Sequence, residues 1–267
     1  MKMQDHVQIL LDSARYALDD IESGYRNSLA KKELDIQLFV QIKNLLENLR
    51  SALDYVAREV FNKFCTGLVR EKPLQVYFPV LRRTATAQDF SAFMNGRFPG
   101  LQVNAHELYN CLEECQFYKS SANEWLVQFN DLCQSNKHEQ LSPQTRSENK
   151  RTEFADISGG SVSWNDGVQF GPSGITFKPG GKLSFASGGT VRFGQSGMRI
   201  MGRQVDTRAQ APAPDDTSSL RHVVWVDFRF DALGVSALPF LRTCVNEVTA
   251  LIDAVRTTAL SIENNLE

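Results

Sequence analysis

Two short clusters of polar residues have types and spacing that could perform chemistry. Asn48-Leu-Arg-Ser-Ala-Leu-Asp-Tyr55 lies within a long helical pattern, and Asn136-Lys-His138 ends a second one. An arginine can hold an oxyanion, and a histidine can transfer a proton near neutral pH. Each cluster also has a structural interpretation. Arg50 and Asp54 can form an i,i+4 ion pair, and positive charge at a helix C-terminus is favoured by the helix dipole.

Few other side chains are suited to catalysis. The sequence holds no phosphate-binding loop, zinc-protease motif or nucleophile elbow. The four histidines are His6, His106, His138 and His222. The five cysteines are Cys65, Cys111, Cys115, Cys133 and Cys244. Cys111 and Cys115 share a helical face near His106, but no second ligand pair follows at a metal-binding spacing. We therefore expect helix packing there, and neither a metal nor a cofactor.

Composition narrows the class of protein without naming an activity. The chain has 267 residues and a formal net charge of −2, which gives no reason to expect bulk attraction to nucleic acid or to an anionic membrane. The N-terminal segment is amphipathic and carries several aspartates, unlike a signal or transit peptide. No apolar run approaches the roughly 20 residues that span a bilayer. We expect a cytoplasmic protein with no membrane partner.

Apolar periodicity predicts the elements that position these clusters. A helix over the first 30 residues and a longer one from about residue 33 to 64 form an antiparallel hairpin. Three shorter helices are predicted to begin at the capping residues Thr86, Asn104 and Ser121, each followed three positions later by an acid. Residues 1–140 are therefore predicted to form a helical bundle. Residues 221–267, a strand and a long helix, are predicted to complete it.

Between these parts, residues 141–220 are predicted to form a linker and β-module region. A polar linker over 139–152 leads into it, the glycine-rich β module has its core at 157–202, and a second linker covers 206–220. Apolar–polar–apolar triplets recur between glycines: Val168-Gln-Phe170, Ile175-Thr-Phe177, Leu183-Ser-Phe185, Val191-Arg-Phe193 and Met198-Arg-Ile200. Alternation places both apolar residues of a triplet on one face of a short strand. We expect a meander whose apolar face docks on the helices or on another copy. The predicted fold class is mainly α with an inserted small β module.

Several motifs together resemble a known group. Asn48-Leu-Arg-Ser-Ala-Leu-Asp54, Phe78-Pro79, Gln116-Phe-Tyr118 and Asn136-Lys-His138 are similar to uncharacterised bacterial helical proteins that read Asn-Leu-Arg-Ser-Ala-Leu-Asp-His and Asp-Lys-His-Arg. That group resembles the HEPN superfamily, which includes RNA-cleaving toxins and antiviral nucleases. The resemblance covers roughly residues 30–141, with an echo over 223–255. It implies a role in RNA biology or bacterial defence.

The resemblance also implies a site, with one departure. In HEPN proteins an arginine and a histidine a few residues later form a composite site across a dimer, and this chain has Tyr55 where the histidine is expected. A tyrosine of ordinary pKa is a poor general base at neutral pH. The implied catalytic set is Arg50, Tyr55 and His138, the last supplying an imidazole from elsewhere. The implied binding residues are Asn48, Asp54, Asn136 and Lys137.

Three functional hypotheses stay open at this point. The first is a weakened or rebuilt HEPN-like endoribonuclease. The second is a non-catalytic binding or assembly module, a homo-oligomer formed through the β insertion. The third is a small-molecule enzyme with an unrecognised pocket. For the β module itself, an RNA-binding platform with Trp164 as a stacking residue is the alternative to self-association.

Overall fold

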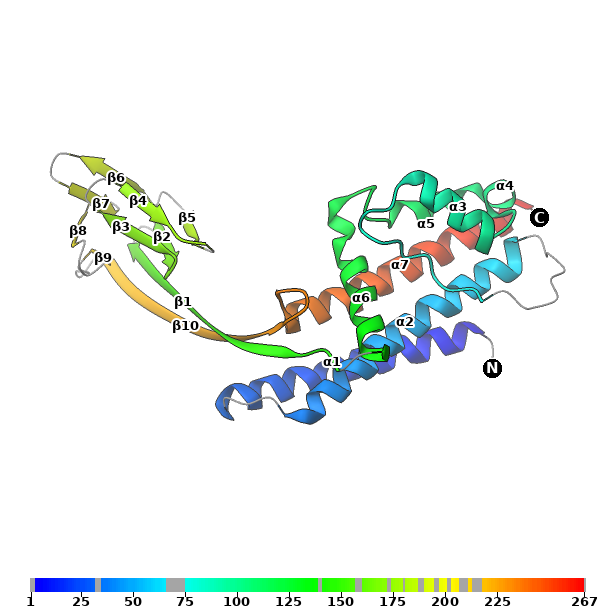
Figure 1. Ribbon diagram of the computed structural model, residues 1–267, viewed down its shortest axis with the longest axis horizontal. Coiled ribbons are helices and arrows are strands. Elements are labelled where there is room, and N and C mark those ends of the chain that lie inside the picture. Colours follow the sequence, from blue (N-terminus) through cyan, green and yellow to red (C-terminus); the bar gives the residue numbers. More distant parts are fainter. Residues whose placement is uncertain are drawn as a thin grey trace. The chain divides into compact units, whose positions relative to one another are not determined.

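The computed structural model divides into two compact units, Met1–Thr145 with Phe228–Glu267, and Arg146–Asp227. The first unit is helical and the second is built of strands (Figure 1). This confirms the predicted fold class. The described residues are 3–31, 35–65, 75–138, 141–156, 160–171, 174–179, 181–186, 190–194, 197–200, 203–206, 211–212 and 218–266.

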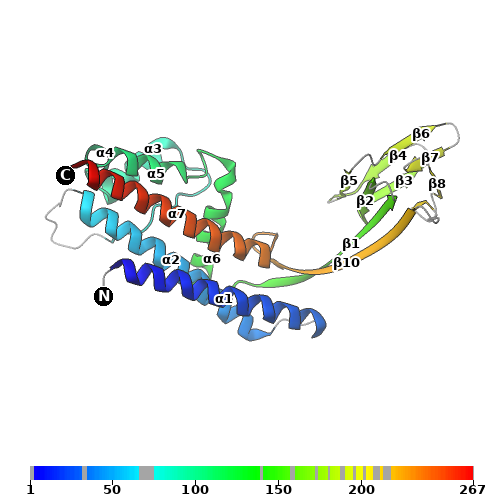
Figure 2. The ribbon, with the colours of Figure 1, turned by 180° about the vertical axis from the view of Figure 1, so that it is seen from behind.

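Three long helices dominate the helical unit. α1 (Met3–Lys31) and α2 (Ile36–Phe64) pack as an antiparallel hairpin, and α7 (Ala237–Leu266) runs along α2 (Figures 1 and 2). Asp35 caps α2, since its side chain accepts a hydrogen bond from the Gln37 amide at 2.9 Å. The C-terminal helix therefore belongs to the same packed unit as the N-terminal hairpin.

Shorter helices cover one side of this trio: α3 (Ala87–Arg97), α4 (Leu101–Asn104), α5 (His106–Glu114), a 3₁₀ turn (Ser121–Asn123) and α6 (Glu124–His138). Thr86 and Asp89 form the predicted capping box of α3. The other two predicted caps are wrong. Asn104 donates its side-chain amide to the Phe64 carbonyl, so the start of α5 has no side-chain cap. Ser120, one residue before the predicted Ser121, caps the 3₁₀ turn.

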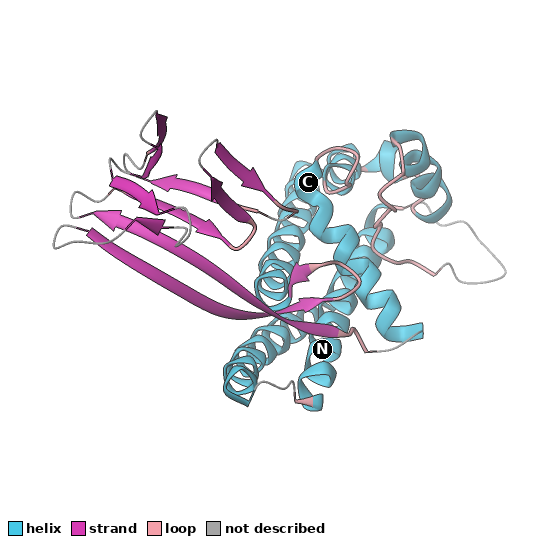
Figure 3. Ribbon diagram, turned by 60° about the vertical axis from the view of Figure 1, so that its left-hand side comes forward, coloured by secondary structure: helices cyan, strands magenta, loops and turns pink. Residues whose placement is uncertain are grey.

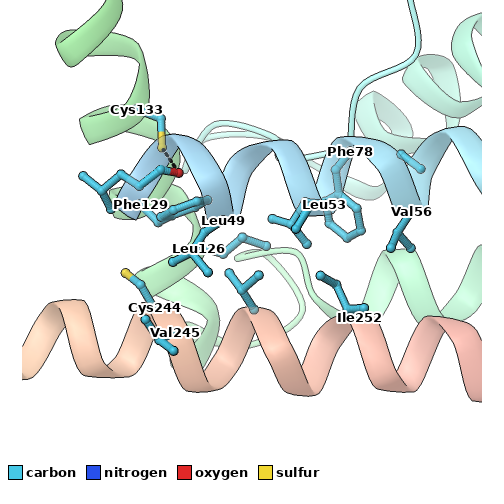
Figure 4. Packing of buried hydrophobic residues seen from close by; sticks show 14 of the residues in the cluster. Leu49, Leu53, Val56, Phe78, Leu126, Phe129, Cys133, Cys244, Val245 and Ile252 are labelled. Carbon is cyan, nitrogen blue, oxygen red and sulfur yellow. Dashed lines mark hydrogen bonds between the residues drawn. The ribbon is translucent and has the colours of Figure 1, made fainter. Parts of the chain in front are cut away.

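All seven described helices contribute to the core of the helical unit, and one part of it lies where α2, α6 and α7 meet. Figure 4 shows Leu49, Leu53 and Val56 of α2 facing the side chains that α7 contributes. The labelled partners are Leu126, Phe129 and Cys133 of α6 and Cys244, Val245 and Ile252 of α7, all buried. The apolar stripes predicted for α2 and α7 thus pack against each other, which is how an amphipathic helix becomes stable in a folded protein.

Two long strands join the helical unit to the β unit in sequence. β1 (Gln144–Asp156) and β10 (Ser218–Phe230) are neighbours in one sheet (Figure 3). Its strand order is β11-β10-β1-β2-β5, where β11 is Val235–Ser236, β2 is Ser161–Asn165 and β5 is Leu183–Ala186. The predicted linker over residues 139–152 is therefore wrong from residue 144 onward. The polar sequence of β1 does not show the apolar alternation that predicts a strand. The strand forms because its backbone groups pair with those of β2 (Ser161–Asn165), from Arg151↔Asn165 to Ala155↔Ser161.

Each predicted triplet forms a strand: β3 (Val168–Gly171), β4 (Gly174–Phe177), β5 (Leu183–Ala186), β6 (Val191–Gly194) and β7 (Gly197–Ile200). β3 pairs with β4, and β6 to β9 follow one another in a sheet that includes β8 (Arg203–Asp206) and β9 (Ala211–Pro212). These pairings are those of a meander, whereas β2 pairs with β1 and β5. β11 (Val235–Ser236) pairs with the end of β10.

The β unit has a hydrophobic core of its own. Its buried members are Phe154, Val162, Trp164, Val168, Phe170 and Ile200, with Ile175, Leu183 and Val191 partly buried against them. The expectation that the apolar face must dock elsewhere is wrong for these residues, because strands of three sheets cover one another. The side chains of Phe193 and Met198 lie outside the described residues.

Candidate functional site

Arg50 lies on the face of α2 that looks toward α6 and the extended segment before α3. Its guanidinium donates from Nη1 to Asn130 Oδ1 at 3.1 Å and from Nη2 to the Phe78 carbonyl at 3.2 Å. Nη2 is also 3.3 Å from Asp54 Oδ1, which is the predicted i,i+4 pair. The Arg50 side chain is only 13% exposed. The arginine therefore binds a carboxylate, an amide and a backbone carbonyl of its own chain.

Asp54 also binds the backbone of the 78–81 segment. We use the name clamp for Arg50, Asp54, Asn130 and Gln116, whose side chains join this segment to the helices. The Phe78 amide donates to Asp54 Oδ1 at 2.8 Å, so Arg50 and Asp54 together bind both the carbonyl and the amide of one residue. The Phe78 ring is buried in the core beside α2. This arrangement recognises an extended backbone as a β-ladder does, but with two side chains of a helix as the partners.

Gln116, two residues beyond the end of α5, holds the same segment. Its Nε2 donates to the carbonyls of Pro79 and Leu112, both at 2.9 Å, and its Oε1 accepts from the Leu81 amide at 3.1 Å. Gln116 is 2% exposed, and both ends of its amide are bonded. A buried polar side chain costs free energy unless it is paired, and this pairing satisfies it.

Asn48 and Tyr55 lie toward α1 instead. Asn48 Nδ2 donates to Ser13 Oγ at 3.2 Å, and the Tyr55 ring meets the His6 ring edge-on with centroids 5.8 Å apart. Five residues of an α-helix turn by about 140° beyond one full turn, which separates Tyr55 from Arg50 around the axis. Among the described side chains, Arg50 and Tyr55 are therefore not brought together.

The second cluster ends α6. Asn136 is buried, and its Oδ1 accepts from both the amide and the hydroxyl of Ser142, each at 2.8 Å. These bonds fix the chain as it leaves α6 for β1. The side chains of Lys137 and His138 lie outside the described residues.

Sequence analysis missed the role of two clamp residues. Asn130 was not singled out, and Gln116 was noted only as part of the resemblance. Asn130 is 80 positions from Arg50 in the sequence, so no local spacing links them. Gln116 follows a short helix, where glutamine is usually exposed, so the sequence alone does not indicate its burial.

The cysteines are placed for packing. Burial raises the pKa of the Cys115 thiol to about 12, and its Sγ donates to the Leu112 carbonyl. Burial also raises the pKa of the Cys244 and Cys111 thiols. A raised pKa suppresses the thiolate, which is the nucleophilic and metal-binding form. Within the described part of the chain, no three His, Cys, Asp or Glu side chains cluster as metal ligands.

A small cavity lies between α2 and α7. It measures about 70 Å³ and is lined mainly by apolar residues such as Val60 and Val255. Glu59 and Arg256 form a two-pronged ion pair at its edge, with Nη2–Oε1 at 3.0 Å and Nε–Oε2 at 3.3 Å. Small-molecule sites usually measure about 300–1,000 Å³, so this cavity gives the small-molecule enzyme hypothesis little support.

No protein-family model, curated protein or solved structure matches this chain. The described helices include none that is both long enough and apolar enough to cross a membrane.

Proposed function

We propose that this chain is a non-catalytic binding protein, in which the helical unit is a scaffold and the β unit carries the binding surface. The observation that carries the proposal is the clamp. Arg50 has three partners within the chain, and its side chain is largely buried. An incoming phosphate would have to break these contacts, and an arginine already paired with Asp54 attracts an anion less strongly.

The resemblance to HEPN proteins supports a shared scaffold more than a shared reaction. Three of its motifs meet in the clamp: Arg50 and Asp54 from the first, Phe78-Pro79 from the second and Gln116 from the third. Their mutual bonds account for these residue types without a substrate. The presence of tyrosine instead of histidine at position 55 also favours a non-catalytic role, since tyrosine is a weak base at neutral pH.

The β unit supports the binding role. It has its own core, and it also exposes the rings of Phe177 and Phe185. β5, at one end of its sheet, pairs only with β2 among the described strands. Exposed aromatic side chains and a sheet edge are common features of recognition surfaces.

A nuclease assay tests the non-catalytic role. The purified full chain is incubated with end-labelled single-stranded RNA beside Arg50→Ala and the more conservative Arg50→Lys. We expect no cleavage above background from any of the three. Cleavage by the wild type that is lost in Arg50→Ala, with the melting temperature unchanged, would restore the endoribonuclease hypothesis.

A further inference from the structure

The connection between β4 and β5 packs on the turn between β2 and β3. Gly181 N donates to the Lys178 carbonyl at 2.9 Å, which closes a tight turn. Lys178 N donates to the Gly167 carbonyl at 2.8 Å, and Lys182 N donates to Asn165 Oδ1 at 2.9 Å. The last two bonds join the backbone of each lysine to Gly167 and to Asn165, and so place both lysines beside the same turn.

Two glycines permit this close packing. A Cβ atom on Gly167 would lie 2.6 Å from Gly181 Cα, and one on Gly181 would lie 2.5 Å from the Gly167 carbonyl oxygen. Both contacts are with backbone atoms, which cannot rotate away as a side chain can. The position of the two lysines thus depends on glycine at 167 and 181.

Two aromatic residues flank the lysines in the sequence, since Phe177 directly precedes Lys178 and Phe185 follows Lys182 by three positions. Phe177 is opposite Val168 in the β3–β4 ladder, and Phe185 is opposite Val162 in the β2–β5 ladder. Directly opposite residues of antiparallel strands project to the same face, and both valines are buried in the core of the β unit. The two rings are nevertheless 54% and 52% exposed. They therefore lie at the rim of that core, with one face or edge in solvent.

The charge of this region favours a polyanion over a second copy of the chain. Residues 157–202 hold four basic side chains and one carboxylate, Asp166, a balance of +3 in a chain whose net charge is −2. Lys178 and Lys182 are both exposed. Two copies joined through this surface would bring like charges together, whereas a phosphate backbone would be attracted.

We propose that Phe177, Lys178, Lys182 and Phe185 form a binding strip for single-stranded nucleic acid. The rings stack on bases and the lysines bind phosphates, a combination that requires unpaired bases with free faces. Trp164, the stacking residue suggested by the sequence, does not take part because it is 4% exposed and belongs to the core. The proposal rests on the proposed function in placing binding on the β unit.

Fluorescence anisotropy of labelled poly-uridine RNA, with the full chain, tests the strip. Phe177→Ala and Phe185→Ala should each raise Kd about fivefold or more, with the salt dependence unchanged. The double variant Lys178→Gln/Lys182→Gln should reduce the slope of log K against log salt by about 1.4, since each phosphate contact contributes about 0.7. A duplex of equal length should bind more weakly. Tyr16→Ala and Arg26→Gln, exposed positions on α1, are the matched controls and should bind like the wild type.

Three outcomes would overturn the strip. The first is wild-type binding that all four strip substitutions leave unchanged. The second is that the chain binds no RNA but forms a multimer in light scattering, and that the double variant Phe177→Ala/Phe185→Ala dissociates this multimer. In that case the β unit still carries the binding surface, and its partner is a second copy of the chain. The third is RNA binding that only Arg50→Ala removes at unchanged stability, and then the proposed function fails as well.

Discussion

Arg50 and Asp54, two residues of the predicted site, bind groups of their own chain, and Gln116 binds the same segment beside them. Arginine provides five donors in a planar fork, and here the fork reaches a carboxylate, an amide and a carbonyl in one buried place. Two of the three acceptors, Asn130 Oδ1 and the Phe78 carbonyl, belong to other elements that pack against α2. The same geometry that would hold a phosphate instead joins α2 to α6 and to the 78–81 segment.

This role predicts the effect of removing the guanidinium. Arg50→Ala should lower the free energy of unfolding by about 2–4 kcal/mol, because Asp54 and the Phe78 carbonyl lose a partner in a largely buried place. The free energy of unfolding of Arg50→Lys should lie between those of the wild type and Arg50→Ala, since lysine keeps the positive charge but not the planar set of donors. Urea denaturation measures these free energies of unfolding. Arg26→Ala is the control, because the Arg26 side chain is 74% exposed and its removal should change stability by less than about 0.5 kcal/mol. A midpoint for Arg50→Ala equal to that of the wild type would mean that the clamp does not stabilise the fold.

At the scale of elements, local patterns predicted most of the structure. The stripes of α2 and α7, the capping box of α3 and the five triplet strands follow from periods of 3.6 and 2 and from glycine punctuation. β1 was missed because a polar strand lacks that pattern, and its ladder partners are not encoded locally. The Arg50–Asp54 pair was predictable from its spacing. Its contacts with Phe78 and Asn130 were not, since they arise only from tertiary packing.

The capping box of α3 gives a prediction about pH. Hydrogen bonds from the Thr86 amide and hydroxyl lower the pKa of Asp89 below its ordinary value. A carboxyl whose pKa is lower in the folded state stabilises the fold above its unfolded pKa of about 3.9, and this contribution is lost as pH falls further. The melting temperature of the wild type should therefore exceed that of Asp89→Asn at neutral pH, and the gap should close in acid. A gap of equal size throughout would show that the ionised carboxylate plays no part.

Glycine at 181 gives a second prediction at this scale. Gly181→Ala should displace the β4–β5 connection, because the new methyl group would overlap the Gly167 carbonyl. We expect faster amide exchange at Lys178 and Lys182, whose backbone bonds depend on that contact. Gly96→Ala is the control, since a methyl group there meets no atom within 4 Å apart from the local backbone of its own helix. Unchanged amide exchange at both lysines would mean that their backbone hydrogen bonds do not depend on the close packing of the β4–β5 connection on the β2–β3 turn.

At the scale of the whole molecule, the described residues form two cores with no buried residue in common. A substitution in one core should therefore destabilise its own unit first. Phe170→Ala should cost the β unit about 3–5 kcal/mol, and Leu49→Ala should cost the helical unit about 2–5 kcal/mol. Amide exchange followed by mass spectrometry should rise over 161–200 in the first variant and over α2 and α7 in the second. A rise across both units from either substitution would mean that they unfold as one cooperative body.

The division into scaffold and binding unit is tested most directly by amide exchange of the full chain with and without saturating single-stranded poly-uridine RNA. We expect protection over 174–186, where Phe177, Lys178, Lys182 and Phe185 lie, and no change over 46–58 or 76–81. Protection centred on Arg50 and the 78–81 segment, with none in the β unit, would contradict this division and make the clamp a ligand site.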